Sequence, residues 1–285
     1  MIDIKTSAKP TATATATKRP EIWAVANQKG GVGKTTTAVN LAASLGVLKK
    51  KVLLIDLDPQ GNATMGSGLQ KTELPYSATD VLLGTTPIEA VIQPTQVGYR
   101  LIGANRDLAG VELSLIDMPR REYILKEALA KIEHEYDFIL IDCAPSLNLL
   151  TINALSAATG VIIPMQCEYY ALEGLADLSG TIERIREVLN PDIKIRGVLR
   201  TMFDPRNTLA NDVSRELSTH FGAIMLETII PRNVRLAEAP AHGMPVMFYE
   251  KGSRGALSYL SAAAELVRTG KKKGMSKGMI KGSSI

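Results

Sequence analysis

The sequence predicts an α/β protein, with one domain in which helices cover both faces of a mostly parallel, twisted sheet. Two observations predict this class. Short apolar runs, near-continuous as in strands buried on both faces, recur through residues 21–269, and longer stretches with helical periodicity separate them. The composition agrees, since 45% of the 285 residues are hydrophobic and 22% are charged, as in an ordinary globular chain.

The predicted strands are runs rich in valine, isoleucine and leucine, which favour a buried extended backbone. They lie at 22–26, 52–57, 138–141, 161–164, 193–199 and 224–230, with a weaker candidate at 99–102. The predicted helices repeat apolar residues every three or four positions, at 35–48, 121–133, 147–158, 172–189, 208–221 and 254–268. Strands and helices therefore alternate, as parallel strands joined by crossover helices require.

The two ends of the chain differ from its body. We expect a disordered leader at 1–20, a folded domain at 21–269 and a basic flexible tail at 270–285, because both ends are too poor in apolar residues to pack. The ends carry +3 and +5, so the body carries −4 although the whole chain carries +4. Any binding to nucleic acid must therefore use the ends or a local basic patch.

Several classes of protein are excluded. No apolar run reaches the roughly 18–20 residues of a membrane-spanning helix, and residues 1–20 lack the apolar segment of a secretory signal. Cys143 and Cys167 are too few for a disulfide framework or a four-thiolate metal site. We therefore expect a cytoplasmic protein.

A phosphate-binding loop follows the first predicted strand. Residues 27–36 read NQKGGVGKTT and lead directly into a helix. Three glycines let backbone N–H groups face an anion at the positive end of the helix dipole. Lys34 adds a cation for the phosphates, and the Thr35 hydroxyl is placed to ligate Mg²⁺. The residues expected to bind ATP here are Lys29, Gly30, Gly31, Val32, Gly33, Lys34, Thr35 and Thr36.

The loop departs from the common G-x-x-x-x-G-K-[ST] pattern at one position, because Gln28 stands where that pattern has glycine. It also contains a second lysine, Lys29, five residues before Lys34. A lysine at this place is not required to cradle phosphates within one subunit. The loop by itself therefore leaves Lys29 without a role.

Acidic residues end two of the predicted strands. Asp56 and Asp58 follow one buried run, and Asp142 ends another. The carboxyl ends of parallel strands face the ligand crevice, where a carboxylate can hold Mg²⁺ through its waters or orient an attacking water. We expect Asp56 and Asp142 to join Thr35 at the metal. A strand-end turn former is the simpler alternative for Asp142.

These motifs resemble those of the ParA/Soj-type partition ATPases, which belong to the deviant-Walker P-loop class together with MinD. The matching segments are KGGVGKT at 29–35, DLDPQGN at 56–62, IDCAPS at 141–146, QCEYYALEG at 166–174 and IPRNVRLAEAP at 230–240. The resemblance covers about 21–268 and implies a single P-loop NTPase domain that hydrolyses ATP with Mg²⁺ and forms a nucleotide-sandwich homodimer.

The resemblance also implies roles for residues of the site. In this family the lysine that matches Lys29 reaches across the dimer to the partner's phosphates, which makes it catalytic together with Lys34 and Asp58. Asp58 would orient the attacking water, and Asp142 would be the acid of the Walker B strand. Because an aspartate is a weak general base at neutral pH, we expect slow intrinsic turnover.

Further implications concern the base, DNA and partners. Residues that match Pro231 and Asn233 contact adenine, and Arg206 and Arg235 fall near DNA-contacting arginines of the family. A solvated arginine is the simpler alternative for Arg235. The family binds double-stranded DNA non-specifically as the ATP dimer and is stimulated by a ParB-type centromere-binding protein, which implies nucleoid association. Ala144 departs from the family, which commonly has a proline there.

Two other functions stay open. A MinD-like ATPase that positions cell division on a membrane would need an amphipathic carboxyl-terminal helix. Residues 271–282 contain three glycines and three large apolar residues, so such a helix would be weak and membrane binding is the less favoured interpretation. The other alternative is a metabolic enzyme of the same fold, such as a ligase that uses ATP to activate a small acid.

Overall fold

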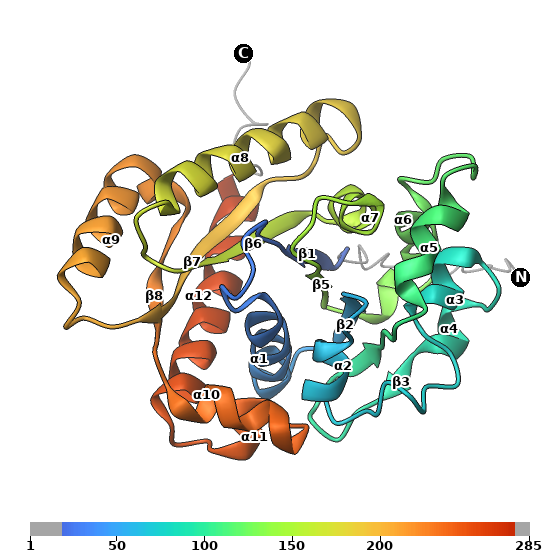
Figure 1. The fold of residues 1–285 in the computed structure, drawn as a ribbon, viewed down its shortest axis with the longest axis horizontal. Helices are drawn as coiled ribbons and strands as arrows, with labels where there is room; N and C mark the ends of the chain where they lie inside the picture. Colours follow the sequence, from blue (N-terminus) through green and yellow to red (C-terminus); the bar gives the residue numbers. More distant parts are fainter. Residues whose placement is uncertain (1–18, 277–285) are drawn as a thin grey trace, which may run out of the picture.

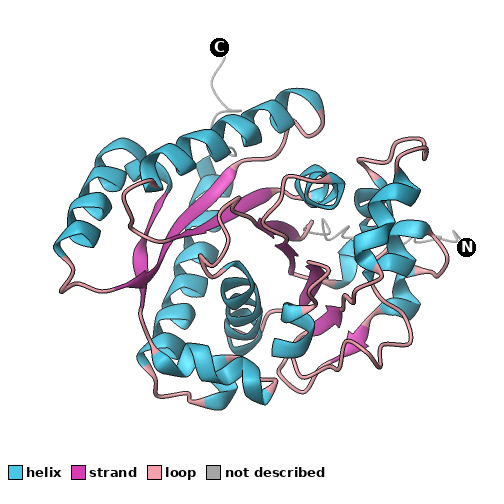
Figure 2. Ribbon diagram, in the orientation of Figure 1, coloured by secondary structure: helices cyan, strands magenta, loops and turns pink. Residues whose placement is uncertain are grey.

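The computed structural model describes residues 19–276, so nearly all of the predicted leader and the end of the basic tail lie outside the described residues. Within this range, eight strands form one sheet in the order β3-β4-β2-β5-β1-β6-β7-β8 (Figure 1). Neighbouring strands are parallel, except that β3 pairs antiparallel with β4 at the edge. Helices cover both faces of the sheet (Figure 2). The predicted fold class is confirmed.

The strands follow the predicted apolar runs closely. They are β1 (Glu21–Val25), β2 (Val52–Leu57), β3 (Gln93–Pro94), β4 (Arg100–Ile102), β5 (Phe138–Cys143), β6 (Gly160–Met165), β7 (Ile195–Phe203) and β8 (Met225–Pro231). The sequence did not predict β3, because an edge strand of two residues has no periodic pattern. In addition, β7 continues to Phe203, past its predicted end at 199.

The helices include all six that were predicted and several short ones that were not. They are α1 (Lys34–Val47), α2 (Asn62–Gly66), α3 (Ala78–Leu83), α4 (Ile88–Val91), α5 (Leu108–Leu115), α6 (Ile124–Leu129), α7 (Leu149–Ala157), α8 (Ala171–Val188), α9 (Thr208–Phe221), α10 (Val234–Glu238), α11 (Val246–Tyr249) and α12 (Arg254–Ser276). α6 is shorter than predicted, and α12 continues past 268. No helix of the described residues is long and apolar enough to cross a membrane.

Two helical layers bury opposite faces of the same strands. Along β1, Ile22 and Ala24 belong to the core that includes α7, α8 and α9. Trp23 and Val25 belong to the core formed with α1 and α12. Because successive side chains of a strand alternate between faces, both sets are buried. This explains why the central strands appear in the sequence as continuous apolar runs.

The register of the central strands decides where the functional groups meet. β2 pairs with β5 so that Asp56 lies opposite Asp142, and Val25 at the end of β1 also lies opposite Asp142. Asp56 lies two residues after Leu54, and Asp142 lies two residues after Leu140. Both carboxylates are therefore on the face of the sheet that packs against α1. The chain leaves β1 through the glycine loop into α1, so the loop and both carboxylates meet at one edge of the sheet.

Asn190 ties the end of α7 to the segment after α8. Its buried amide donates hydrogen bonds to the main-chain oxygens of Leu155, at 2.8 Å, and Ala158, at 2.7 Å. Asn211 on α9 also donates to two main-chain oxygens, but these bonds lie at the surface. The two asparagines therefore form a matched pair that differs in burial.

Asn190→Ala is expected to lower the free energy of unfolding by about 1–3 kcal/mol, because two buried oxygens lose their partner. Asn211→Ala is expected to change it by less than about 0.5 kcal/mol, because water can replace the lost bonds. Urea denaturation followed by circular dichroism measures both values. Equal losses in the two variants would contradict this account of α7 and α8.

Candidate functional site

The glycine loop forms an open cradle at the start of α1. Gly31 and Gly33 have φ angles of 73° and 87°, in the left-handed region that favours glycine. A Cβ atom on Gly30 or Gly31 would meet no atom within 4 Å, so this part of the loop faces open space. The first N–H groups of α1 have no side-chain cap. They are the donors that a phosphate accepts at a helix amino terminus.

Lys34 is buried in the cradle. Its side chain is 7% exposed, and Nζ donates a hydrogen bond to the main-chain oxygen of Lys29 at 2.9 Å. Burial lowers the pKa of Lys34, and the nearby Asp142, Cys143 and Asp58 oppose this shift. A bound phosphate would add negative charge beside this ammonium and so offset its desolvation.

Asp56 is satisfied by its own chain. Its Oδ2 accepts hydrogen bonds from the backbone N–H of Thr64 at 2.8 Å and from the Thr64 hydroxyl at 2.7 Å, and Oδ1 accepts from the N–H of Asp58 at 3.2 Å. Burial raises the pKa of Asp56 to about 6, and the hydrogen bonds from Thr64 oppose the rise. Asp56 therefore holds the turn that carries Asp58.

Asp142 is different, because it is fully buried and neither carboxylate oxygen has a hydrogen-bond partner among residues 19–269. Burial, followed by the charge of Asp56, raises the pKa of Asp142 well above its usual range. The Thr35 hydroxyl and Lys34 lie near enough to oppose this rise, although the hydroxyl does not meet the geometry of a hydrogen bond. Asp142 is thus the strand-end carboxylate with oxygens available to a ligand.

These residues fit Mg²⁺. This ion takes oxygen ligands, keeps several waters and is often held by one or two carboxylates together with substrate phosphates. No group of three histidines, cysteines, aspartates or glutamates in the described part of the chain could hold an ion by itself. Thr35 and Asp142 would therefore hold the metal together with a nucleotide. Asp56 has less to offer, since both its oxygens already accept hydrogen bonds.

Asp58 lies at the edge of the cradle in the turn after β2. Its Oδ1 accepts a hydrogen bond from the backbone N–H of Gln60 at 2.9 Å. Gly61 closes the turn with a φ angle of 63°, and a Cβ atom there would lie 2.6 Å from the main-chain oxygen of Ala104. The turn therefore needs glycine, and it holds the half-buried Asp58 beside the loop.

A cavity of about 360 Å³ opens beside the cradle. Its walls include the loop and the ends of two distant strands, through Gly33, Thr36, Thr201, Met202, Pro231 and Asn233. Asn233 caps α10, because its Oδ1 accepts a hydrogen bond from the N–H of Arg235 at 3.1 Å. The amide N–H groups of Asn233 are then available to a ligand. This cavity next to the phosphate cradle suits an aromatic base. Both residues predicted to contact adenine, Pro231 and Asn233, line it.

Sequence reasoning missed the part of this cavity formed by β7. The Thr201 hydroxyl lies 2.8 Å from the main-chain oxygen of Val32 and 3.1 Å from that of Met165. Met202 has a φ angle of 51°, which is uncommon for a residue other than glycine and marks local strain. Both residues follow the predicted end of their strand. A threonine at the carboxyl end of a parallel strand was the signal that could have found them.

Lys29 is engaged outside the loop. Its side chain is 55% exposed, and its ammonium pairs with the half-exposed carboxylate of Glu168 in the segment after β6. Its backbone, in contrast, belongs to the cradle, since the N–H donates to Asn27 at 2.9 Å and the carbonyl accepts from Lys34. Gln166 reaches the same loop by donating to the main-chain oxygen of Gly31 at 3.0 Å.

Arg206 follows β7 and Arg235 follows β8, so both lie at the carboxyl ends of the strands, as the cradle does. Arg206 forms two parallel hydrogen bonds to Asp204, at 2.9 and 2.7 Å, and these bonds lower the pKa of that carboxyl to about 2. Arg235 pairs with Glu238 at 2.7 Å. Each candidate DNA contact is therefore exposed but already has a carboxylate beside it.

The arrangement defines a class of protein, the P-loop nucleotide-binding proteins, because an open glycine loop at a helix amino terminus meets a buried lysine and strand-end carboxylates. A family model described as an AAA domain matches residues 20–195. The sporulation initiation inhibitor protein Soj of Bacillus subtilis is 49% identical, over 88% of this chain and 99% of that protein. The chromosome partitioning protein ParA of Myxococcus xanthus is 48% identical, over 87% and 88%. The chain belongs to the ParA/Soj family of partitioning ATPases.

A solved structure supports the fold. The cobyrinic acid a,c-diamide synthase from Mycobacterium smegmatis with bound ADP and magnesium has a TM-score of 0.79 and 40% sequence identity. The match covers 88% of this chain and 96% of that protein. The predictions of a P-loop NTPase fold and of the ParA/Soj resemblance are therefore confirmed.

The unpartnered carboxylate predicts a dependence of stability on pH. A carboxyl whose pKa is raised on folding stabilises the protein most below its unfolded-state pKa, near 4, and this stability is lost as the pH rises through the folded-state value. Without nucleotide and magnesium, the unfolding free energy of wild type is expected to fall from this cause as the pH rises from pH 5 to pH 8. Asp142→Asn should lose less, because an amide does not ionise.

Urea denaturation at several pH values, compared between wild type and Asp142→Asn, measures the titration of Asp142 together with its coupling to Asp56. The difference in unfolding free energy between the two proteins should change steadily with pH. A difference that stays constant from pH 5 to pH 8 would contradict the buried, unpartnered state of Asp142.

Proposed function

We propose that this ATPase is a partition protein that segregates a chromosome or plasmid. The ATP-bound chain forms a sandwich homodimer that binds double-stranded DNA without sequence specificity. Hydrolysis, stimulated by a ParB-type centromere-binding protein, then releases it from the nucleoid. The observation that carries the proposal is Lys29, whose side chain pairs with Glu168 at the surface while Lys34 serves its own cradle. A lysine so placed is available to a second copy of the chain.

ATP and Mg²⁺ are the cofactors of this site. The N–H groups of α1 and the ammonium of Lys34 bind the phosphates, and Thr35 and Asp142 hold the metal. Pro231 and Asn233 contact the base in the adjacent cavity. The ion, when bound, neutralises charge on the phosphates. The protein supplies the fixed cradle and the buried carboxylate that orient both.

Hydrolysis depends on Asp58. Its carboxylate orients the attacking water from the turn that Asp56 and Gly61 hold in place. An aspartate is a weak general base at neutral pH, so intrinsic turnover is slow. Lys29 of a second copy adds positive charge where the phosphate charge develops. ATP then acts as a timer, because the dimer persists until the γ-phosphate that bridges it is cleaved.

DNA binding is assigned to the edge that carries Arg206 and Arg235. Both arginines are exposed and paired, so binding would exchange the carboxylates of Asp204 and Glu238 for backbone phosphates. Dimerisation doubles this patch, and the lysines of 270–285 can add to it. Such contacts weaken with added salt, because they release counterions from the DNA.

The 40% identity to a diamide synthase supports a second candidate, an enzyme that uses ATP to activate a small acid. Its turnover would depend on the acid and would not respond to DNA. The partition relatives match this chain at 48–49% identity, which favours the partition function. The experiments below separate the two.

Asp58→Ala is expected to keep ATP binding and dimer formation while turnover falls at least about a hundredfold, because the water loses the group that orients it. Phosphate release measures turnover, and light scattering in ATP measures the dimer. Asp177→Ala, on an exposed position of α8, is the matched control and should behave as wild type. Wild-type turnover in Asp58→Ala would remove Asp58 from this role.

Lys29→Ala is expected to keep nucleotide binding but to lose the ATP dimer, because its side chain acts on the partner. Co-sedimentation with random-sequence duplex DNA, in ATP, in ADP and without nucleotide, measures the consequence. Wild type should bind in ATP alone, less at higher salt, and Lys29→Ala should not bind in any state. Lys126→Ala, an exposed lysine of α6, is the control for the lost charge.

An ATP dimer of Lys29→Ala in light scattering would overturn the cross-subunit role. Equal DNA binding by wild type in all three nucleotide states would mean that the basic ends bind DNA whatever the nucleotide. It would overturn the proposal that ATP controls DNA binding. If wild type does not bind DNA but binds anionic lipid vesicles, the MinD-like function replaces the partition function.

A further inference from the structure

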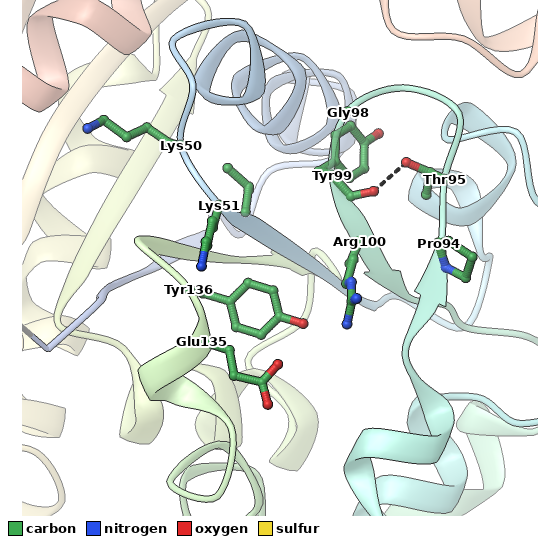
Figure 3. Close-up of a pocket in the computed structure, with 10 residues that line it drawn as sticks. Lys50, Lys51, Pro94, Thr95, Gly98, Tyr99, Arg100, Glu135 and Tyr136 are labelled. Atoms are coloured by element: carbon green, nitrogen blue, oxygen red, sulfur yellow. Dashed lines mark hydrogen bonds between the residues drawn. The ribbon is translucent and has the colours of Figure 1, made fainter.

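A second, larger cavity lies at the opposite edge of the sheet from the nucleotide site. Its volume is about 570 Å³, within the range of small-molecule sites. It opens at the amino ends of β2, β4 and β5, between the residues shown in Figure 3. The glycine loop, which defines the nucleotide site, takes no part in it. Its chemistry comes from Lys50, Lys51, Tyr99, Arg100, Glu135 and Tyr136.

The cavity is lined by three cationic side chains. Lys50, Lys51 and Arg100 line it, and none of the three forms an ion pair with a residue of the described chain. Glu135 lines the same cavity but lies beyond ion-pair distance of all three. In contrast, Arg206 and Arg235 at the other edge each have a carboxylate partner.

Tyr136 provides the second, independent observation. Its side chain is 93% buried, and its hydroxyl lies close to the guanidinium of Arg100 without meeting the geometry of a hydrogen bond to any residue of 19–269. Figure 3 shows this hydroxyl directed toward Arg100, with the carboxylate of Glu135 on the same side and Lys51 near the ring. Burial raises the pKa of Tyr136 and the nearby guanidinium of Arg100 opposes the rise, so the group is a neutral hydroxyl that can donate a hydrogen bond. A buried polar group without a partner is costly unless a ligand satisfies it.

The walls of the cavity are otherwise fixed. The Tyr99 hydroxyl is hydrogen-bonded to Ser67 at 2.7 Å, and Thr95 donates to the main-chain oxygen of Tyr99 (Figure 3). The backbone of Lys51 is tied to Asp137, whose carboxylate accepts from its N–H at 2.9 Å. The charged side chains thus project from a rigid frame.

The geometry points to a binding site for a small phosphate-bearing molecule, up to the size of a mononucleotide. The planar guanidinium of Arg100 can donate two parallel hydrogen bonds to a phosphate. Lys51 adds a second cation, and the Tyr136 hydroxyl adds a neutral donor. Glu135 can accept a hydrogen bond from a sugar hydroxyl. This site is separate from the ATP site and does not depend on the partition function.

The test measures binding with the nucleotide site already filled. The full chain is saturated with ADP and excess Mg²⁺ and titrated by calorimetry with inorganic pyrophosphate and, separately, with GMP. Lys34→Ala without nucleotide provides the same test in a chain whose phosphate cradle is disabled. At least one probe is expected to bind in both backgrounds with the same affinity.

Variants then assign the binding to this cavity. Arg100→Ala should weaken it at least tenfold, and Tyr136→Phe, which removes the hydroxyl and keeps the ring, at least threefold. Arg106→Ala, an exposed arginine outside the cavity, should leave the affinity unchanged. Equal affinity for both probes would mean that the cavity recognises the phosphate alone. Tighter binding of GMP would mean that the walls and Glu135 also contact the nucleoside.

Two results would overturn the proposal. One is that neither probe binds at millimolar concentration in either background. The other is that binding survives Arg100→Ala unchanged, which would place it at the basic ends or elsewhere. Circular dichroism and urea denaturation of each variant ensure that a loss of binding is not a loss of fold. Either result would overturn only the proposed phosphate site, and the proposals of an ATP dimer and of DNA binding would be unaffected.

Discussion

Asp56 lies opposite Asp142 in the register of β2 and β5, and the nucleotide site depends on how this buried negative charge is balanced. Two neighbouring carboxylates in a dry interior disfavour each other's ionised form. Thr64 satisfies Asp56 through its backbone and its hydroxyl, whereas Asp142 has Lys34 nearby and no hydrogen bond within the described chain. The site is therefore incomplete in positive charge beside Asp142, which a magnesium ion would supply.

The parallel sheet brings the rest of the site to the same edge. The carboxyl ends of β1, β2, β7 and β8 lie at the same edge, so the glycine loop, Asp58, Thr201 and Asn233 converge although they are far apart in sequence. The amino ends of β2, β4 and β5 take no part in the nucleotide site. The larger cavity at that edge has no glycine loop, and its capacity for anions comes from side chains alone.

Lys29 joins the site to the proposed dimer. The lysine pairs with Glu168, and both side chains are about half exposed. Such pairs contribute only about 0–1 kcal/mol, because water screens them. Lys29 can therefore leave Glu168 at little cost when a partner's phosphates offer a stronger attraction. The exposed position of this lysine agrees with the role that the family implies for it.

The sequence by itself determined the α/β class, seven of the eight strands, the phosphate loop with Lys34, and the acids that end β2 and β5. Each is a local property, since glycine spacing, apolar runs and strand-end acids are readable within a few residues. Tertiary structure alone decided that Asp142 lacks partners while Asp56 has them, and that Tyr136 and Arg100 share a cavity. Strand register and crossover packing set these distances, and a local pattern carries no information about which distant residue becomes a neighbour.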